Sequence, residues 1–351
     1  MIRFSEHSAL YDIVVKKNNK WRRLNDMTDY SFVYDELKDR YCPDNGRMAE
    51  DPVRMFMYLM IKSILGVSDA DLVEHCMTDM ALKFFLGLVP EDNVIDSTTL
   101  TKFRRQRLRE VSILDKLICK SVEIARSKGI DISRKIIVDS THTLSRSNPT
   151  LPELIRKAKE NIPDLEEVDG DGAYSGQNNL ECAEREGVEL VAKLHPIVAR
   201  GTRENDGFPF NKDAGMMVCP AGHMAVMKVR HKATGKSKNE RFTYHFDILK
   251  CRRCKHAALC GYKKGQNTKT YTITMRTEQQ ERQLERQRTE EFRQKYGIRY
   301  IIEAKDSELK HSYHLDKTIS YGLDAYTLQG AVALFISNLV RINRILDQKG
   351  E

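Results

Sequence analysis

The hydrophobic period of the chain changes at Lys135-Ile-Ile-Val-Asp139, and this change limits the folds that the chain can adopt. Before it, residues 49–128 carry apolar side chains at helical spacing. The segment 135–139 is instead a short β-branched run ending in an acid, which is typical of a buried strand. Helix-like segments at 152–160 and 178–186 follow, with another strand-like segment at 188–192. The sequence therefore predicts an α/β fold, in which an all-helical N-terminal region precedes a core with parallel strand pairing.

Residues 200–275 differ in composition from the segments on either side. They are rich in Gly and Lys, hold four clustered cysteines and are expected to include two antiparallel strands, 241–249 and 270–275. Residues 276–310 are strongly charged and helical, and 323–346 form an apolar closing helix. We expect three parts: a helical N-terminal domain (1–130), an α/β core (131–199 and 276–351) and a small Cys-rich insertion (200–275).

The spacing Tyr296-x2-Arg299-x3-Glu303-x6-Lys310 places one acid among basic and aromatic residues. At about 100° per residue, these four side chains fall within about 60° of arc on one face of an α-helix. A stripe of this kind is usually a solvated face with stabilising ion pairs. Two earlier acidic strand ends, at Asp139 and Asp171, suggest instead a carboxylate trio with Glu303.

Three carboxylates at strand and helix ends suit a two-metal site for phosphoryl transfer. Mg²⁺, or Mn²⁺ in its place, prefers oxygen ligands, and two ions about 4 Å apart can activate an attacking hydroxyl and stabilise the leaving oxygen. A rigid strand end makes Asp139 a fitting central ligand, and the nearby His142 is a candidate to contact nucleic acid. Asp171 has a rival in Asp169, and Asp-Gly is also an ordinary turn signal.

Basic residues gather in two zones of the chain. Residues 98–135 hold 11 basic and 4 acidic residues, and 250–295 hold 13 basic and 5 acidic residues. Two such zones on either side of an acidic trio suit a polyanion such as DNA, although basic helices also simply face water. In the first zone, the candidate DNA contacts are Lys102, Arg104 and Arg105.

The eight cysteines divide into four scattered and four clustered residues, which favours a metal site over disulfides. Cys251-x2-Cys254-x5-Cys260 offers three thiolates, and Cys219 is the preferred fourth ligand. His223, four residues further on, is the alternative fourth ligand. The set predicts a structural Zn²⁺ ion that stabilises a turn-rich insertion, with free surface thiols as the other interpretation.

Neither a secretory signal nor an apolar stretch long enough to cross a bilayer is expected from the sequence. Residues 1–10 include Arg3 and Glu6 without an apolar core, and the apolar run 53–66 is interrupted by Arg54 and Lys62. We therefore expect a cytoplasmic protein without a membrane partner.

These motifs together resemble the insertion-sequence DDE transposases, whose catalytic core is ribonuclease-H-like. Residues 51–108, with Phe84-Phe-Leu-Gly-Leu and Ser97-Thr-Thr-Leu-Thr-Lys-Phe-Arg, resemble the helical N-terminal domain of this family. The segment 136–143 resembles its first-acid motif, and Asp171-Gly-Ala-Tyr-Ser matches the second better than Asp169 does. The spacing from Tyr296 to Lys310 matches the third-acid signature throughout.

The resemblance implies a transposase that cuts DNA at element ends and joins the freed 3′-hydroxyl to target DNA. Asp139, Asp171 and Glu303 would hold the divalent ions. Arg299 and Lys310 would contact phosphates, and Tyr296 would stack on a base or pack the helix. Related transposases carry a similar Cys-rich insertion, which favours a structural zinc site. The expected partners are the terminal repeats, target DNA and a second copy of the chain on paired ends.

The chain departs from the family in one place, because only 31 residues separate Asp139 from Asp171. A ribonuclease-H-like core inserts a strand pair and a helix there, whereas this segment has room for one helix. An internal deletion that removed the strand pair is the simplest interpretation, and it would leave unpaired strand edges. Four alternatives stay open: an active transposase, an inactivated copy, a nuclease that cuts DNA without joining it, and a non-catalytic DNA-binding remnant or repressor of related transposases.

Overall fold

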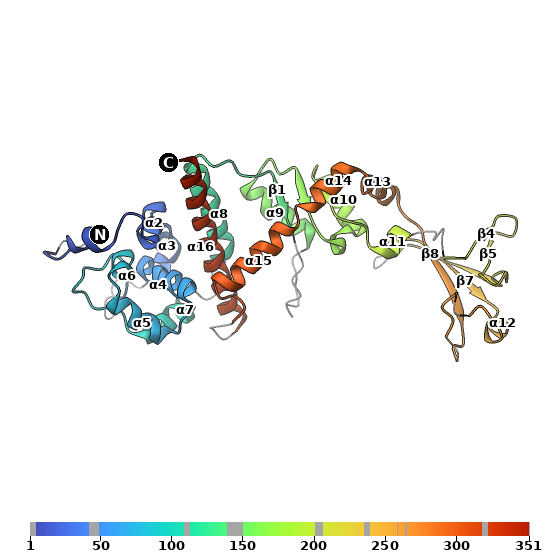
Figure 1. The fold of residues 1–351 in the computed structure, drawn as a ribbon, viewed down its shortest axis with the longest axis horizontal. Helices are drawn as coiled ribbons and strands as arrows, with labels where there is room; N and C mark the ends of the chain where they lie inside the picture. The colour runs from blue at the N-terminus through green and yellow to red at the C-terminus, as the bar shows by residue number, and fades with distance from the viewer. Residues whose placement is uncertain are drawn as a thin grey trace. The chain divides into compact units, whose positions relative to one another are not determined.

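The computed structural model describes residues 5–41, 49–108, 113–138, 150–200, 206–234, 239–257, 259–263, 265–317 and 322–350. The chain divides into two compact units, shown with their elements in Figure 1. The first unit joins Met1–Ile132 to Glu303–Glu351, and the second unit is Ser133–Ile302. These units divide the chain differently from the three domain ranges expected from the sequence, which stay a prediction.

The described part of the first unit contains helices and no strand, in line with the helical N-terminal region expected from the sequence. Its elements are α1 (Leu10–Val14), α2 (Lys20–Met27), α3 (Phe32–Leu37), η1 (Lys38–Arg40), α4 (Pro52–Leu65), α5 (Asp69–Thr78), α6 (Met80–Phe85), α7 (Ser97–Gln106), α8 (Ile113–Ser127) and α16 (Leu323–Lys349). Helix α15 (Tyr300–Ser312) begins at the end of the second unit and continues into the first.

Helix α4 lies at the centre of the first unit because its sequence is apolar around most of its circumference. The Asp51 side chain accepts a hydrogen bond from the Val53 amide, Pro52 occupies the first turn, and Gly66 ends the helix in the left-handed conformation. The Phe56 side chain is fully buried and meets Phe335 of α16 at a ring-centroid distance of 6.1 Å.

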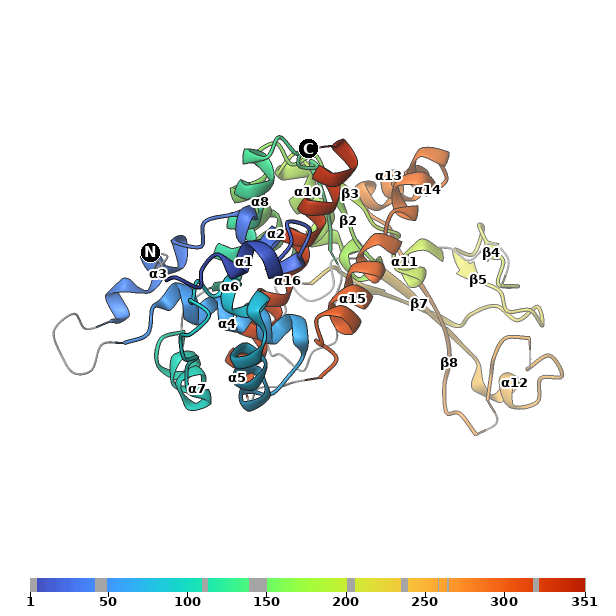
Figure 2. The same ribbon diagram turned by 60° about the vertical axis from the view of Figure 1, so that its left-hand side comes forward.

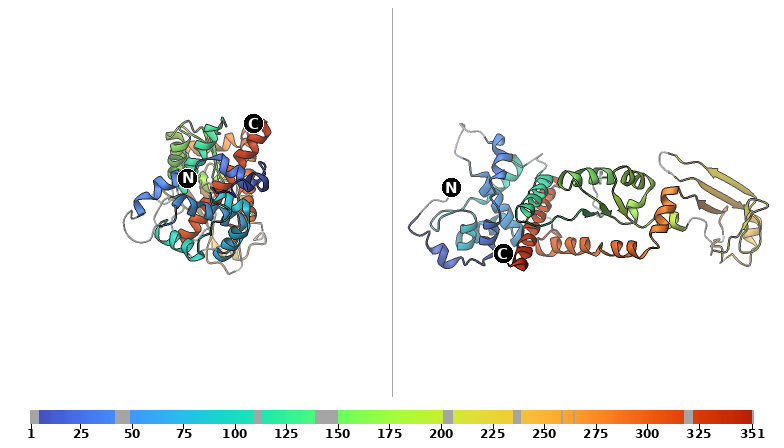
Figure 3. Two further views of the ribbon diagram at one scale, coloured as in Figure 1. Left: turned by 90° about the vertical axis from the view of Figure 1, so that its left-hand side faces the viewer. Right: turned by 90° about the horizontal axis from the view of Figure 1, so that it is seen from above.

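Helix α16 packs along α8, as Figure 3 shows, and contributes eight buried apolar residues to the core of the first unit. Its length and apolar composition alone would also allow it to cross a membrane, so the expectation that no apolar stretch is long enough was wrong. A single helix of this kind is weak support for a membrane span, because a buried core helix has the same composition. The sequence places this helix in the α/β core, whereas the structure packs it among the N-terminal helices.

The second unit contains a short parallel sheet with strand order β1-β2-β3. These strands are β1 (Lys135–Ile137), β2 (Glu167–Asp169) and β3 (Glu189–Val191). The accompanying helices are α9 (Leu151–Asn161), η2 (Gly172–Ser175), α10 (Gln177–Arg185), α11 (Pro196–Arg200), α13 (Glu278–Arg286) and α14 (Glu290–Gly297). Among the residues described between β1 and β2 there is one helix and no strand, so the ribonuclease-H-like assignment stays a prediction.

The two faces of this sheet are chemically different, since neighbouring strand residues point to opposite faces. Val168 is fully buried in an apolar cluster with Ile155 of α9 and Leu180 of α10. Glu167, one residue earlier, pairs with Lys295 of α14. The Gln283 side chain of α13 donates to the Leu190 and Ala192 carbonyl oxygens at 3.2 and 2.8 Å. It therefore satisfies carbonyl groups along edge strand β3.

The insertion in the second unit is an antiparallel β structure, as the sequence predicts for two of its strands. Strands β6 (Met227–His231), β7 (Arg241–Phe246) and β8 (Lys269–Thr274) form one sheet, in which β7 and β8 run side by side (Figure 2). A smaller pair and a short helix complete it: β4 (Phe210–Asn211), β5 (Met216–Met217) and α12 (Ile248–Arg252). The Phe208 and Tyr271 rings stack at 4.3 Å in its small core.

Candidate active site

The two earlier acids of the predicted trio differ in what the structure shows of them. Asp139, together with His142, lies outside the described residues. Asp171 follows β2 by two residues and caps the short helix η2, where its Oδ1 accepts a hydrogen bond from the Ala173 amide at 3.0 Å. The side chain is partly exposed and has no basic partner in the described part of the chain. Its carboxylate is therefore available to a ligand.

Asp169, the rival second acid, lies inside the second unit at the end of β2. It is 1% exposed, and neither of its carboxylate oxygens has a hydrogen-bond partner among the described residues. Burial and the nearby Glu167 carboxylate raise the pKa of Asp169 to about 6. Because Asp171 is accessible and Asp169 is not, the geometry favours Asp171 as the acid that meets a substrate.

The buried carboxylate predicts that Asp169→Asn stabilises the second unit. The folded pKa lies above the ordinary value of 3.8, so wild-type stability falls as pH rises from about 4 through 6. Above pH 6 the amide should gain about 1 to 3 kcal/mol over the wild type, and below pH 4 the difference should vanish. Hydrogen exchange of the β2 amides at pH 5 and 8 measures this. A less stable variant at pH 8 would reveal a partner for the carboxylate.

The predicted helical stripe from Tyr296 to Lys310 is wrong in one respect, because the helix is interrupted. Helix α14 ends at Gly297 and α15 begins at Tyr300. Between them the chain turns with i,i+3 hydrogen bonds, such as Ile302 N–H to the Arg299 carbonyl at 3.1 Å. Glycine in a helix interior costs about 1 kcal/mol relative to alanine, which explains the break at this position. Tyr296 and Arg299 therefore precede the helix that carries Glu303.

Tyr296 lies in a cluster of aromatic and basic side chains at the end of α14. Its ring stacks on Phe292 at a centroid distance of 5.9 Å, and its hydroxyl accepts a hydrogen bond from Arg299 at 3.1 Å. The Lys193 ammonium lies over the same ring, 4.4 Å from the centroid. Tyr296 thus packs against its own helix and holds two cations beside it.

Lys193 is a candidate site residue that the sequence reasoning missed. It follows β3 by two residues, it is exposed, and its ammonium has no carboxylate partner among the described residues. A side chain built on Gly172 would approach the Lys193 carbonyl to 3.3 Å, so this backbone borders the turn of Asp171. Ligands of parallel sheets bind beyond the carboxyl ends of the strands. The sequence could have indicated this role, because Lys193 comes directly after the strand-like segment 188–192.

The last two residues of the signature lie on α15. Glu303 is exposed and has no ion-pair partner in the described ranges, so its carboxylate is available. Lys310 is exposed and pairs with Asp306 one turn earlier, at 2.5 Å. This i,i+4 pair is the type that stabilises a solvated helix face, and its solvent exposure leaves Lys310 able to exchange partners.

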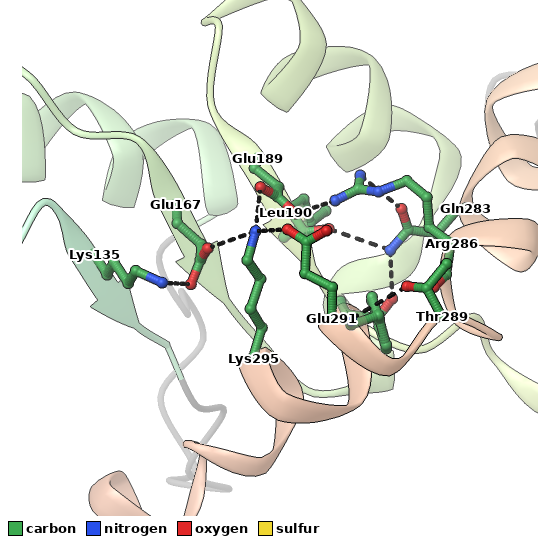
Figure 4. A network of polar contacts seen from close by, with 11 residues as sticks. Lys135, Glu167, Glu189, Leu190, Gln283, Arg286, Thr289, Glu291 and Lys295 are labelled. Carbon is green, nitrogen blue, oxygen red and sulfur yellow. Dashed lines mark hydrogen bonds and ion pairs between the residues drawn. The ribbon is translucent and has the colours of Figure 1, made fainter.

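A network of charged side chains joins the other end of the sheet to α14 (Figure 4). The Lys295 ammonium lies 3.3 Å from Glu167, 2.9 Å from Glu189 and 2.8 Å from Glu291. Hydrogen bonds to Glu291 and Glu189 raise the pKa of Lys295, which stays charged. Lys135 also pairs with Glu167, at 2.7 Å. The network ties the end of α14 to all three strands.

The three basic candidates on helix α7 have different surroundings. Lys102 and Arg105 are exposed. Arg104 is instead 16% exposed, and its guanidinium binds both carboxylate oxygens of Asp69. The ion pair favours a structural role for Arg104 and leaves the other two side chains available to DNA.

The four clustered cysteines line one pocket of the insertion, and both His223 and His256 line it too. Burial, followed by the neighbouring thiols of Cys260, Cys219 and Cys254, raises the pKa of Cys251. The structure therefore brings the predicted thiols together. In the described ranges, however, no three Cys, His, Asp or Glu side chains are arranged closely enough to hold a metal ion. The zinc site is thus not established by the geometry.

Comparisons with protein families give two matches along the chain. Residues 9–106 match a transposase domain family, DUF772, and residues 218–343 match a transposase DDE domain family. No curated protein and no solved structure matches the chain. The second match includes the cysteine cluster and the whole segment from Tyr296 to Lys310. Together with that segment's spacing, the two matches show that the chain belongs to the insertion-sequence DDE transposases.

Proposed function

We propose that this transposase cuts DNA at the ends of its element and joins the freed 3′-hydroxyl to target DNA. The observation that carries the proposal is the surroundings of Asp171. Its available carboxylate lies at the carboxyl end of a parallel strand, and its turn borders Lys193, which contacts Tyr296 of the third-acid signature. DNA phosphoryl transfer requires a carboxylate that binds a metal cation and basic side chains that bind phosphate.

In this proposal, Asp139, Asp171 and Glu303 bind two Mg²⁺ or Mn²⁺ ions. The described donors fit these ions, because Asp171 and Glu303 are carboxylates that no described basic side chain neutralises. When bound, the ions supply activation of the attacking oxygen and stabilisation of the leaving oxygen. Asp171 is held by its hydrogen bond from Ala173, which leaves its second oxygen free of protein partners in the described ranges.

The basic residues of the signature orient the DNA backbone. Arg299 and Lys193 flank the Tyr296 ring, so a phosphate at this place meets two cations, while Lys310 acts further along α15. His142, Lys102 and Arg105 are proposed as outer DNA contacts. We also propose that two copies pair on the element ends, that residues 1–130 form a DNA-binding domain, and that the protein is cytoplasmic.

Replacing Lys193 tests one predicted phosphate contact. Lys193→Ala should weaken binding to element-end DNA with little change between sequences. It should also reduce the slope of log affinity against log salt by about 1, because one fewer counterion is released. Fluorescence anisotropy over a salt series measures the slope. Lys212→Ala, an exposed lysine in the turn between β4 and β5, is the matched control and should leave the slope unchanged.

A nicking and joining assay separates the proposed function from its alternatives. Labelled element-end DNA is incubated with Mg²⁺ or Mn²⁺ and a target plasmid, and both nicks and joined products are followed. Nicks with joined products support transposition, whereas nicks alone indicate a nuclease. Retained DNA binding without metal-dependent cleavage would favour an inactivated copy that acts as a DNA-binding repressor.

We also propose that Cys219, Cys251, Cys254 and Cys260 bind a structural Zn²⁺ ion, with His223 as the alternative to Cys219. Support comes from the pocket that the four cysteines share and from the affinity of thiolates for zinc. Purified protein should contain about one zinc per chain, and Cys251→Ser/Cys254→Ser should lose it and expose the insertion to proteolysis. Cys182→Ser, a buried thiol elsewhere, is the control. A zinc-free wild type with a folded insertion would contradict the proposal.

A further inference from the structure

The charged network around Lys295 joins three strands that lie in register. Lys135 of β1 lies in register beside Glu167 of β2, and Glu167 lies in register beside Glu189 of β3. The Glu167 side chain is only 4% exposed, so it requires cationic partners, and Lys135 and Lys295 supply them. Figure 4 shows Lys295 reaching from α14 to both Glu167 and Glu189. Lys295 therefore links α14 to the acids of two neighbouring strands, Glu167 and Glu189.

The residue that follows Lys295 in the chain is Tyr296, at the centre of the proposed DNA contact. Tyr296 is bonded to Arg299 and lies under Lys193. A shift of the end of α14 moves Tyr296 and Arg299 together, while Lys193 and the turn of Asp171 stay with the sheet. The Lys295 ion pairs oppose such a shift, because Glu167 and Glu189 belong to the strands.

We propose that Lys295 is a positioning residue, which holds Tyr296 and Arg299 beside Lys193 through its ion pairs with Glu167 and Glu189. The inference rests on the proposed role of Arg299 at DNA. Lys295 itself contacts no substrate. Its removal acts on DNA through Arg299, and this predicts an energetic coupling between the two positions.

A double-mutant cycle measures this coupling. The probe is a fluorescein-labelled duplex of the DNA that borders the coding sequence, bound in Ca²⁺ buffer. Arg299→Ala and Lys295→Met should each weaken binding about tenfold, and the double variant should bind no more weakly than Arg299→Ala alone. Lys295→Arg should restore most of the affinity. Arg293→Met, on the same helix and paired with Glu290 alone among the described residues, should bind as the wild type does.

Each outcome decides between distinct conclusions. Three results would overturn the positioning role and leave the proposed function intact. They are additive losses of affinity in the cycle, equal DNA affinities of Lys295→Met and Arg293→Met, and no recovery of affinity in Lys295→Arg. Unchanged binding by Arg299→Ala would overturn the proposed DNA contact itself and the inference with it. If Lys295→Met does not fold, Glu189→Gln in the same cycle replaces it, since that change weakens the ion pairs of Glu189 with Lys295 and Arg286 at a partly exposed position.

Discussion

Asp171→Asn is expected to lower metal-dependent nicking of element-end DNA by about a thousandfold or more. The amide keeps the size of the side chain and an oxygen that accepts the Ala173 hydrogen bond, so the turn should persist. It lacks the negative charge that a divalent ion requires from this position. The initial nicking rate at saturating Mn²⁺ measures the effect. Mn²⁺ binding by calorimetry should weaken in parallel.

Asp169→Asn is the matched control for this experiment, because it lies on the same strand end and makes the same chemical change. Its carboxylate is buried and has no partner in the described part of the chain, so nicking by this variant should stay within about threefold of the wild type. The opposite ranking, with Asp169→Asn inactive and Asp171→Asn active, would identify Asp169 as the second acid. Full activity of both variants would contradict the two-metal proposal.

Asp69→Asn is expected to destabilise the first unit by about 3 kcal/mol at pH 7. Asp69 is 17% exposed and lies between Lys62 and Arg104, which are 10% and 16% exposed. The amide would leave two buried cations facing each other without a counter-charge. Urea unfolding followed by Trp21 fluorescence measures the loss, because the single tryptophan is buried in the core of this unit.

The loss should depend on pH with a defined sign. Burial alone would raise the pKa of Asp69, but hydrogen bonds from Arg104 and Lys62 outweigh burial and hold the pKa below its usual range. The stabilisation is thus present above the unfolded pKa of about 4 and disappears as pH falls through the folded pKa. Asp71→Asn, exposed on the same helix, should cost less than about 1 kcal/mol. A comparable loss for both variants would contradict the buried ion triad.

Much of the secondary structure of the core followed from local pattern. The segments predicted as strands contain β1 and β3, and the predicted helices correspond to α9 and α10. The sequence did not predict the break at Gly297, because the intervals between Tyr296, Arg299, Glu303 and Lys310 all agree with one continuous helix. Angular arithmetic assumes an uninterrupted α-helix, and a glycine with i,i+3 turns after it violates that assumption.

The candidate site was predictable to the extent that chemistry follows residue type. Carboxylates, arginine and tyrosine at set spacings identified the third-acid segment, which lies within the matched DDE domain. Residue type alone did not reveal that Arg104 forms an ion pair with Asp69, which is 35 residues earlier in the chain. Lys193 was missed for the same reason, since a lysine after a strand is ordinary until Tyr296 lies against it.

The sequence by itself determined the transposase family, the strand and helix pattern of the core, and the set of acidic, basic and thiol groups. These depend on local propensity, on hydrophobic period and on spacing within short segments. Only the tertiary structure decided that Asp169 is buried while Asp171 is accessible, that α16 packs among the N-terminal helices, and that Lys295 bonds two strands. Burial and charge pairing depend on neighbours far away in the chain, and a single sequence does not specify those neighbours.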